Sequence, residues 1–140
     1  MSNTRYTVAI HVLTLLAYAG PEALTSDYIA GSVNTNPVVI RRILARLRAA
    51  RLVRSQGGPG GGWQLLRAPE AIHLQQVLVA VGADASFPLH AASPNVQCPV
   101  GRSIQDLLTH HFRLAQEALE RQLAGVTLAD LVAGVKAQPA

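Results

Sequence analysis

Residues 52–66 read LVRSQGGPGGGWQLL, two short apolar runs on either side of a tip that holds five glycines and one proline. A segment with helical periodicity precedes this stretch and carries five arginines: Arg41, Arg42, Arg46, Arg48 and Arg51. A glycine tip lets a hairpin approach a sugar–phosphate backbone closely, and a basic helix can enter the major groove of DNA. The pattern therefore predicts a winged helix-turn-helix, with wing strands over residues 52–55 and 63–66.

The residues before the wing supply the rest of this motif. Asn36-Pro37 is typical of a helix start, because asparagine caps the first turn and proline suits the first helical position. The helix that follows is the expected recognition helix, and its apolar face comprises Ile40, Ile43, Leu44 and Leu47. Residues 26–32 are expected to form the preceding helix, and a first helix is expected from about Asn3 to Ala19.

The second half of the chain is predicted to be helical, apart from one long loop. Helices are expected over residues 74–81 and 99–123, and a short last helix is capped by Thr127 with Asp130 in the capping-box position. The fold class is thus mostly α with a small β-hairpin wing. We expect three segments, namely a winged helix-turn-helix DNA-binding domain over 1–82, a loop over 83–98, and a dimerisation helix with a C-terminal helix over 99–140.

The long helix is amphipathic, and part of its apolar face is expected to pair with a two-fold mate. The predicted interface residues are Ile104, Leu108, His111, Ala115 and Leu119. A homodimer would place two recognition helices about 34 Å apart, so the expected target is a palindromic operator in double-stranded DNA.

Composition supports an oligomer that binds a polyanion. Hydrophobic residues make up 49% of the 140 residues and charged residues 14%, yet no apolar run reaches the roughly 20 residues of a membrane-spanning helix. Without a signal peptide, the chain is expected to be cytoplasmic. Net charge is +4, and seven of the twelve basic residues lie between Arg41 and Arg67, where no acidic residue occurs. The plainer alternative is a solvated basic helix face.

Residues at the start of the recognition helix and along the wing are the candidate DNA contacts, because arginine there can bridge guanine O6 and N7. The predicted set is Arg5, Thr35, Asn36, Pro37, Val38, Arg41, Arg42, Arg54, Ser55, Gln56 and Gly58. Amide groups at the helix N-terminus could also donate to phosphate. Arg46 and Arg48 remain open between phosphate contacts and solvated charges.

Several strings in the chain resemble the Rrf2 family of winged-helix regulators: GGPGGGW, RYTVAIHVLTLLA, HLQQVLVAVG, NTNPVVIRRIL and CPVGRSIQDLL. The resemblance implies a dimeric, palindrome-binding transcription factor, usually a repressor, and it suggests that Arg5 touches a phosphate. Trp63 stands where the family usually has tyrosine and is expected to pack the wing base. The wing of the family usually reads Arg-Gly-Pro, whereas Gly57 occupies the arginine position here, which implies less minor-groove readout.

Members of the family that bind an iron–sulfur cluster carry three closely spaced cysteines before the long helix, whereas this chain has only Cys98. His90, His110 and His111 are poor substitutes, because cluster irons prefer thiolates. We therefore expect no cluster and no other cofactor. A metal site at His111 shared across the dimer is conceivable, but a partly buried interface histidine is favoured, so no metal site is expected. A small-molecule effector is conceivable, but no residue pattern identifies it.

Cys98 has two open interpretations. It is either a small buried residue or substitute N-cap ahead of Pro99, or a redox sensor. In the second case the positive end of the helix dipole raises the thiolate content, and oxidation or a disulfide with the partner subunit repositions the wings.

Three functional classes compete. A sequence-specific repressor is favoured, and a non-specific nucleoid-type or RNA-binding protein is the alternative. An enzyme is not expected, because the chain lacks the GxxxxGKS/T, HExxH and GxSxG motifs.

Overall fold

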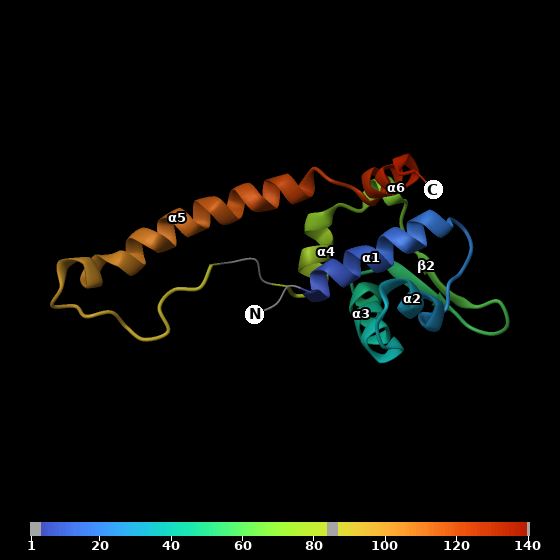
Figure 1. Cartoon of the computed structure of the whole chain (residues 1–140), viewed down its shortest axis with the longest axis horizontal. Helices are drawn as coiled ribbons and strands as arrows, with labels where there is room; N and C mark the ends of the chain where they lie inside the picture. The colour runs from blue at the N-terminus through green and yellow to red at the C-terminus, as the bar shows by residue number, and fades with distance from the viewer. Residues whose placement is uncertain (1–3, 84–86, 140) are drawn as a thin grey trace.

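The computed structural model describes residues 4–83 and 87–139, and its first half forms a winged helix-turn-helix. Three helices, α1 (Thr4–Ala19), α2 (Ser26–Val33) and α3 (Pro37–Ala49), precede a two-stranded antiparallel wing made by β1 (Val53–Gln56) and β2 (Gly62–Leu65). Figure 1 shows α2 and α3 on the same side of α1, with the wing extending beyond them. The predicted fold class is confirmed, although the helix start expected near Asn3 lies outside the described residues.

The helix-turn-helix forms where the sequence places its caps. Asn34 ends α2 in the left-handed region at φ 64°, which turns the chain sharply toward α3. The Asn36 side chain then accepts a hydrogen bond of 2.8 Å from the backbone N–H of Val38, and Pro37 occupies the first turn. The predicted start of the recognition helix is thus confirmed.

The core lies between α1, α2 and α3 and is entirely apolar among the described residues. The predicted inner face of α3 is buried in full: Ile40, Ile43, Leu44 and Leu47. These side chains pack in one cluster with Val12, Leu13 and Leu16 of α1 and Ile29 of α2. Burial of this stripe holds the opposite face of α3 toward solvent.

The wing strands are offset by one residue from their predicted positions. Leu52 is buried but donates its N–H to the carbonyl of Leu47, because it still closes the end of α3. Pairing begins at Val53 with Leu65 and ends at Gln56 with Gly62. Gly62 adopts φ 148°, and a Cβ there would lie 2.5 Å from the Leu24 carbonyl oxygen, so only glycine fits.

The remaining helices differ in how they pack on the winged helix-turn-helix body. A 3₁₀ turn at Pro69–Ala71 leads to α4 (Leu74–Ala80), followed by α5 (Pro99–Ala124) and α6 (Leu128–Ala137). From the sequence, we expect the last helix to belong with the long helix in one segment, 99–140. In the structure, α6 packs on α1, and its Leu128 is fully buried in the core. The N–H of Leu128 donates to the Ile72 carbonyl over 3.0 Å, which fixes this return.

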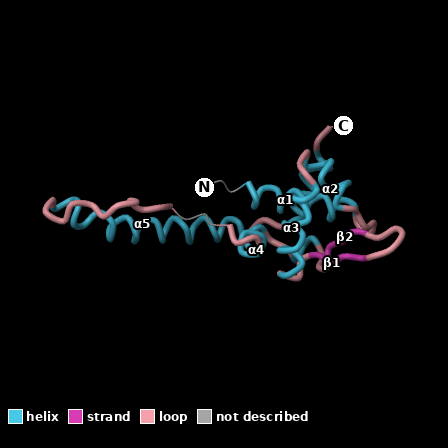
Figure 2. The backbone as a smooth tube through the Cα atoms, turned by 90° about the horizontal axis from the view of Figure 1, so that it is seen from below, coloured by secondary structure: helices cyan, strands magenta, loops and turns pink. Residues whose placement is uncertain are grey.

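Helix α5 projects away from the body as a long arm, seen in both Figure 1 and Figure 2. None of its residues is buried. The chain from residue 87 to 98 runs beside the arm, where the rings of Phe87 and Phe112 lie 5.1 Å apart. Arg102 also donates to the carbonyl of Val96 over 3.3 Å. Among the described residues, no helix is both long enough and apolar enough to cross a membrane.

Candidate nucleic-acid interface

The outward face of α3 presents a mixed apolar and cationic surface. Val38 is 51% exposed, and Arg41 and Arg42 are exposed one turn further along the helix. Val39 is exposed beside them and was missed from the sequence, although its i, i+3 spacing to Arg42 places both on one side. In the major groove, thymine methyl groups can contact apolar side chains such as valine, and guanine O6 and N7 can accept hydrogen bonds from arginine.

The N-terminus of α3 offers fewer amide donors than the sequence suggested. Val38 gives its N–H to the Asn36 side chain, Thr35 gives its own to the Ala30 carbonyl, and Pro37 has none. Thr35 and Pro37 are half-buried, whereas Asn36 is exposed. The exposed part of Asn36 that remains available is therefore its side-chain NH₂ group.

The wing carries a second group of polar side chains. Arg54, Ser55 and Gln56 are all exposed on β1. At the tip, Gly61 donates its N–H to the Gly58 carbonyl over 3.0 Å, and Gly60 has φ 73°. Proline second and a positive-φ glycine third are the features of a type II turn, which keeps the tip narrow.

The structure divides the arginines into free and engaged side chains. Among the described residues, Arg41, Arg42 and Arg54 form no hydrogen bond or ion pair with another group. Arg46 donates to the Val81 carbonyl and Arg5 to the Gly82 carbonyl, each over 3.2 Å. Both cations thus stabilise the C-terminal end of α4, where carbonyl groups carry partial negative charge. Arg46 is committed to this structural role, and Arg5 retains further N–H donors on an exposed side chain.

Arg48 is engaged in a different way, because it connects the recognition helix to the wing. Its guanidinium carbon lies 5.6 Å from the centre of the Trp63 ring. Trp63 is half-buried, and its indole N–H donates to the Ser26 hydroxyl over 3.2 Å. Trp63 pairs with Ser55 within the wing, and its side chain connects β2 to both α2 and α3.

Cys98 occupies the N-cap position of α5 and is exposed, so the small buried residue considered from the sequence is not what the structure shows. The thiol makes no hydrogen bond with cap geometry. The nearby backbone N–H groups of Gly101 and then Val100 nevertheless favour the thiolate and lower the pKa of Cys98. An exposed sulfur whose thiolate form is favoured in this way is suited to oxidation.

The donor set does not fit an iron–sulfur cluster. The chain has a single cysteine, and no group of three or more His, Cys, Asp or Glu side chains gathers in the described part. His110 and His111 are neighbours on α5, but Arg113 lies 3.4 Å from the Nδ1 atom of His110 and disfavours a cation there. Three thiolate ligands are absent from this chain.

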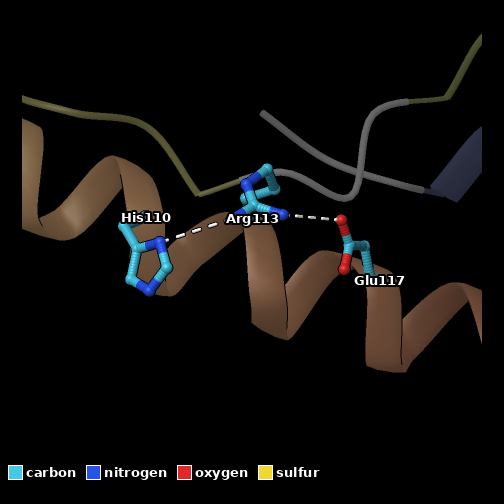
Figure 3. Close-up of polar contacts among 3 residues, drawn as sticks. All are labelled: His110, Arg113 and Glu117. Atoms are coloured by element: carbon cyan, nitrogen blue, oxygen red, sulfur yellow. Dashed lines mark hydrogen bonds and ion pairs between the residues drawn. The ribbon is translucent and has the colours of Figure 1, made fainter.

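The predicted dimer residues lie along the arm, where this chain leaves them incompletely covered. Ile104 and Leu108 are half-buried, while His111, Ala115 and Leu119 are exposed. A polar row runs along the same helix, where Arg113 donates to Glu117 over 3.0 Å next to His110 (Figure 3). Such a half-exposed i, i+4 ion pair contributes little to helix stability. These three side chains make one side of the arm polar.

Known proteins with similar sequences are transcriptional regulators. The Rrf2 family model, described as an iron-dependent transcriptional regulator, matches residues 2–134. The chain is 41% identical over 133 residues to YwnA of Bacillus subtilis strain 168, named as a candidate HTH-type transcriptional regulator, and the match covers 94% of this chain and 97% of YwnA. The HTH-type transcriptional regulator IscR of Erwinia tasmaniensis is 32% identical over 133 residues, covering 94% of this chain and 76% of IscR. A solved structure described as a candidate DNA-binding protein matches with a TM-score of 0.71 and 38% identity, covering 91% of this chain and 97% of that one.

Proposed function

The chain belongs to the Rrf2 family of HTH-type transcriptional regulators, and we propose that it is a homodimeric repressor that binds a palindromic operator in the cytoplasm without an iron–sulfur cluster. The observation that carries the proposal is the face made by α3 and the wing. It combines the exposed Val38 with the free cations of Arg41, Arg42 and Arg54, and no acidic residue occurs between positions 41 and 67.

Helix α3 is proposed to read base edges in the major groove. Arg41 and Arg42 are not tied to other side chains, so they can turn toward guanine O6 and N7 without breaking a bond within the protein. Val38 would offer a methyl surface to thymine. The Asn36 amide and the Thr35 hydroxyl lie at the start of α3, from where they could donate to a phosphate. Pro37 positions these groups by fixing the first turn.

The wing is proposed to bind the neighbouring backbone. Arg54 supplies the charge, Ser55 and Gln56 supply neutral hydrogen bonds, and Gly58 lets the tip approach closely because it has no side chain. Because Gly57 stands in place of an arginine at the tip, the wing is proposed to contribute more to affinity for the duplex than to recognition of its sequence. Arg5 supplies a further phosphate contact through its donors that are not bound to Gly82.

Dimerisation through α5 is supported by apolar side chains that a single chain leaves uncovered. Leu107, Leu114 and Leu119 are 58%, 44% and 37% exposed on the arm. Pairing two arms would cover these side chains together with the predicted set of Ile104, Leu108, His111 and Ala115. The two-fold symmetry of such a pair would match the symmetry of a palindrome.

Cys98 is proposed to make the dimer responsive to oxidants. Peroxide would oxidise the thiolate to a sulfenic acid with release of hydroxide, and a second thiolate, from the partner's Cys98 or a small thiol, would displace hydroxide to form a disulfide. Either product changes the charge at the start of α5, which also anchors the chain from 87 to 98. A shift of the arm would then change the spacing of the two recognition helices.

The test is selection of bound duplexes from a random pool by the full-length dimer at two salt concentrations. We expect enrichment of an inverted repeat whose half-site centres are about 10 bp apart, and affinity that falls steeply with salt. A non-specific nucleoid-type protein would show the same salt dependence without enrichment, and that result would contradict the proposal. Reporter expression from the selected site, with and without the gene, then distinguishes repression from activation.

A further inference from the structure

A pocket of about 660 Å³ opens where α1, α2 and α6 meet, and the proposed function makes no use of it. Its walls are largely apolar and include Leu15 and Tyr18 of α1 with Leu131 and Val135 of α6. None of the residues that line it is an acid, a lysine or an arginine. Figure 1 shows α6 lying across α1 on this part of the body.

One corner of the pocket is polar. His11 of α1 and Ser32 of α2 share a hydrogen bond of 2.9 Å between Nε2 and Oγ, and both residues line the pocket. The two groups can exchange donor and acceptor roles, because the hydroxyl rotates and the imidazole has two tautomers. An apolar chamber with a few converging polar groups is the usual form of a small-molecule site, and such sites measure roughly 300–1,000 Å³.

Gly134 of α6 leaves room at one wall of the pocket. It lies inside α6 and lines the pocket, with no positive φ and with no atom within 4 Å of the position a Cβ would take. Neither backbone conformation nor close packing therefore requires glycine here. Gly134 is exposed, so a larger side chain at this position would occupy space in the pocket.

We propose that this pocket binds an uncharged aromatic molecule of one or two rings that carries a hydrogen-bonding oxygen or nitrogen. The lining offers no acid, lysine or arginine to pair with an ionic ligand, so an uncharged ligand fits it better. The Tyr18 side chain, 55% exposed at the pocket, gains a cover when a second ring packs on it. The polar atom of the ligand bonds to the His11–Ser32 corner.

The pocket also reaches the DNA-binding motif, which gives the ligand a route to regulation. Ser32 belongs to α2, the first helix of the helix-turn-helix, whereas the other walls belong to α1 and α6. A ligand that bonds at Ser32 and packs on α6 fixes the position of α2 on α1. This regulatory consequence rests on the proposed function, but binding itself does not.

The test is calorimetric titration of the full-length protein with 1-naphthol, an uncharged two-ring aromatic molecule that carries one hydroxyl group. Wild type and Gly134→Ala should bind it with the same Kd, because alanine fills little of the space. Gly134→Leu should weaken binding at least tenfold. Both variants replace the same glycine in the same helix, so they differ only in how much of the pocket the new side chain fills.

A second variant guards against misfolding of Gly134→Leu. Val135 is 49% exposed, so Val135→Glu should fold, and its charge at the pocket should also weaken binding at least tenfold. No saturable binding by wild type, or unchanged binding by both variants, would overturn the proposal. Loss of self-association in Gly134→Leu, measured by light scattering, together with no probe binding to wild type would show a second copy of the chain in the pocket instead. DNA binding is measured separately, so a failure of the proposed function is seen independently of the probe.

Discussion

Arg48 of α3 lies over the ring of Trp63 in β2, with 5.6 Å between the guanidinium carbon and the ring centre. This cation–π contact joins α3 to the wing, the two elements that we propose to face DNA. Trp63 is also hydrogen-bonded through its backbone to Leu24, over 3.0 Å and 2.7 Å, so the wing is attached to the chain ahead of α2 as well. The angle between wing and helix is therefore set by contacts within the protein.

Replacement of Trp63 by alanine should loosen the wing and lower stability. The side chain is half-buried, so we expect a loss of roughly 2–3 kcal/mol in the free energy of unfolding, less than for a fully buried aromatic residue. Urea unfolding followed by circular dichroism measures this loss. Arg48→Leu should cost about 1 kcal/mol or less, because the contact is partly solvated. Equal losses in the two variants would contradict the assigned geometry.

Replacement of Arg41 by alanine should weaken binding to the selected operator by about 5-fold to 150-fold and relax preference at one base pair, since a bidentate guanine contact is worth about 1–3 kcal/mol. Fluorescence anisotropy with matched and singly substituted duplexes measures both effects. Arg121→Ala on α5 removes the same charge from an exposed site away from the proposed interface, and it should leave affinity nearly unchanged. A uniform loss with every duplex would instead assign Arg41 to a phosphate.

Placing a charge at Leu108 should dissociate the dimer. Leu108→Glu would bury a carboxylate between two arms, and the cost of an unpaired charge there exceeds that of exposing the leucine. The adjacent Thr109 is exposed and polar, so Thr109→Glu is the matched control. Light scattering at micromolar concentration should show monomer for the first and dimer for the second. Two dimers would contradict the proposed interface.

The lowered pKa of Cys98 gives a pH dependence with a definite sign. Thiolate is the reactive form, so alkylation by iodoacetamide should reach half its maximal rate at a lower pH than with free cysteine, and it should slow as pH falls through the Cys98 pKa. Peroxide should release the operator from wild type but not from Cys98→Ser. Operator binding that ignores peroxide in both proteins would leave Cys98 as an N-cap without a sensing role.

Local signals in the sequence predicted most of the fold. Asn36 and Thr127 are predicted as caps because Pro37 follows the first and Asp130 stands three residues after the second. Both cap side chains make the expected hydrogen bonds. His73 was missed as the cap of α4, where its Nδ1 accepts from Gln76 and the Gln76 side chain accepts from the His73 N–H. Histidine is an uncommon cap, so its role depends on where the neighbouring elements hold it.

The candidate interface was predictable only in part, because residue type does not reveal which arginines are free. Arg42 and Arg46 lie one turn apart on α3, yet Arg46 is bound to the Val81 carbonyl, and the two differ only through the position of α4. Likewise, packing of α6 on α1 joins segments more than a hundred residues apart, a contact that no local pattern encodes.

The return of α6 makes the arm an insertion rather than an appendage. The chain leaves the body after α4 and comes back at Val126, whose carbonyl accepts from the N–H of Leu74 at the other end of α4. The two junctions are thus separated by about the length of α4, on the order of 10 Å, a gap that a linker of about four residues can span. An arm attached in this way can be excised or exchanged between related regulators without opening the body, so the proposed dimer contacts and the proposed DNA contacts can diverge separately.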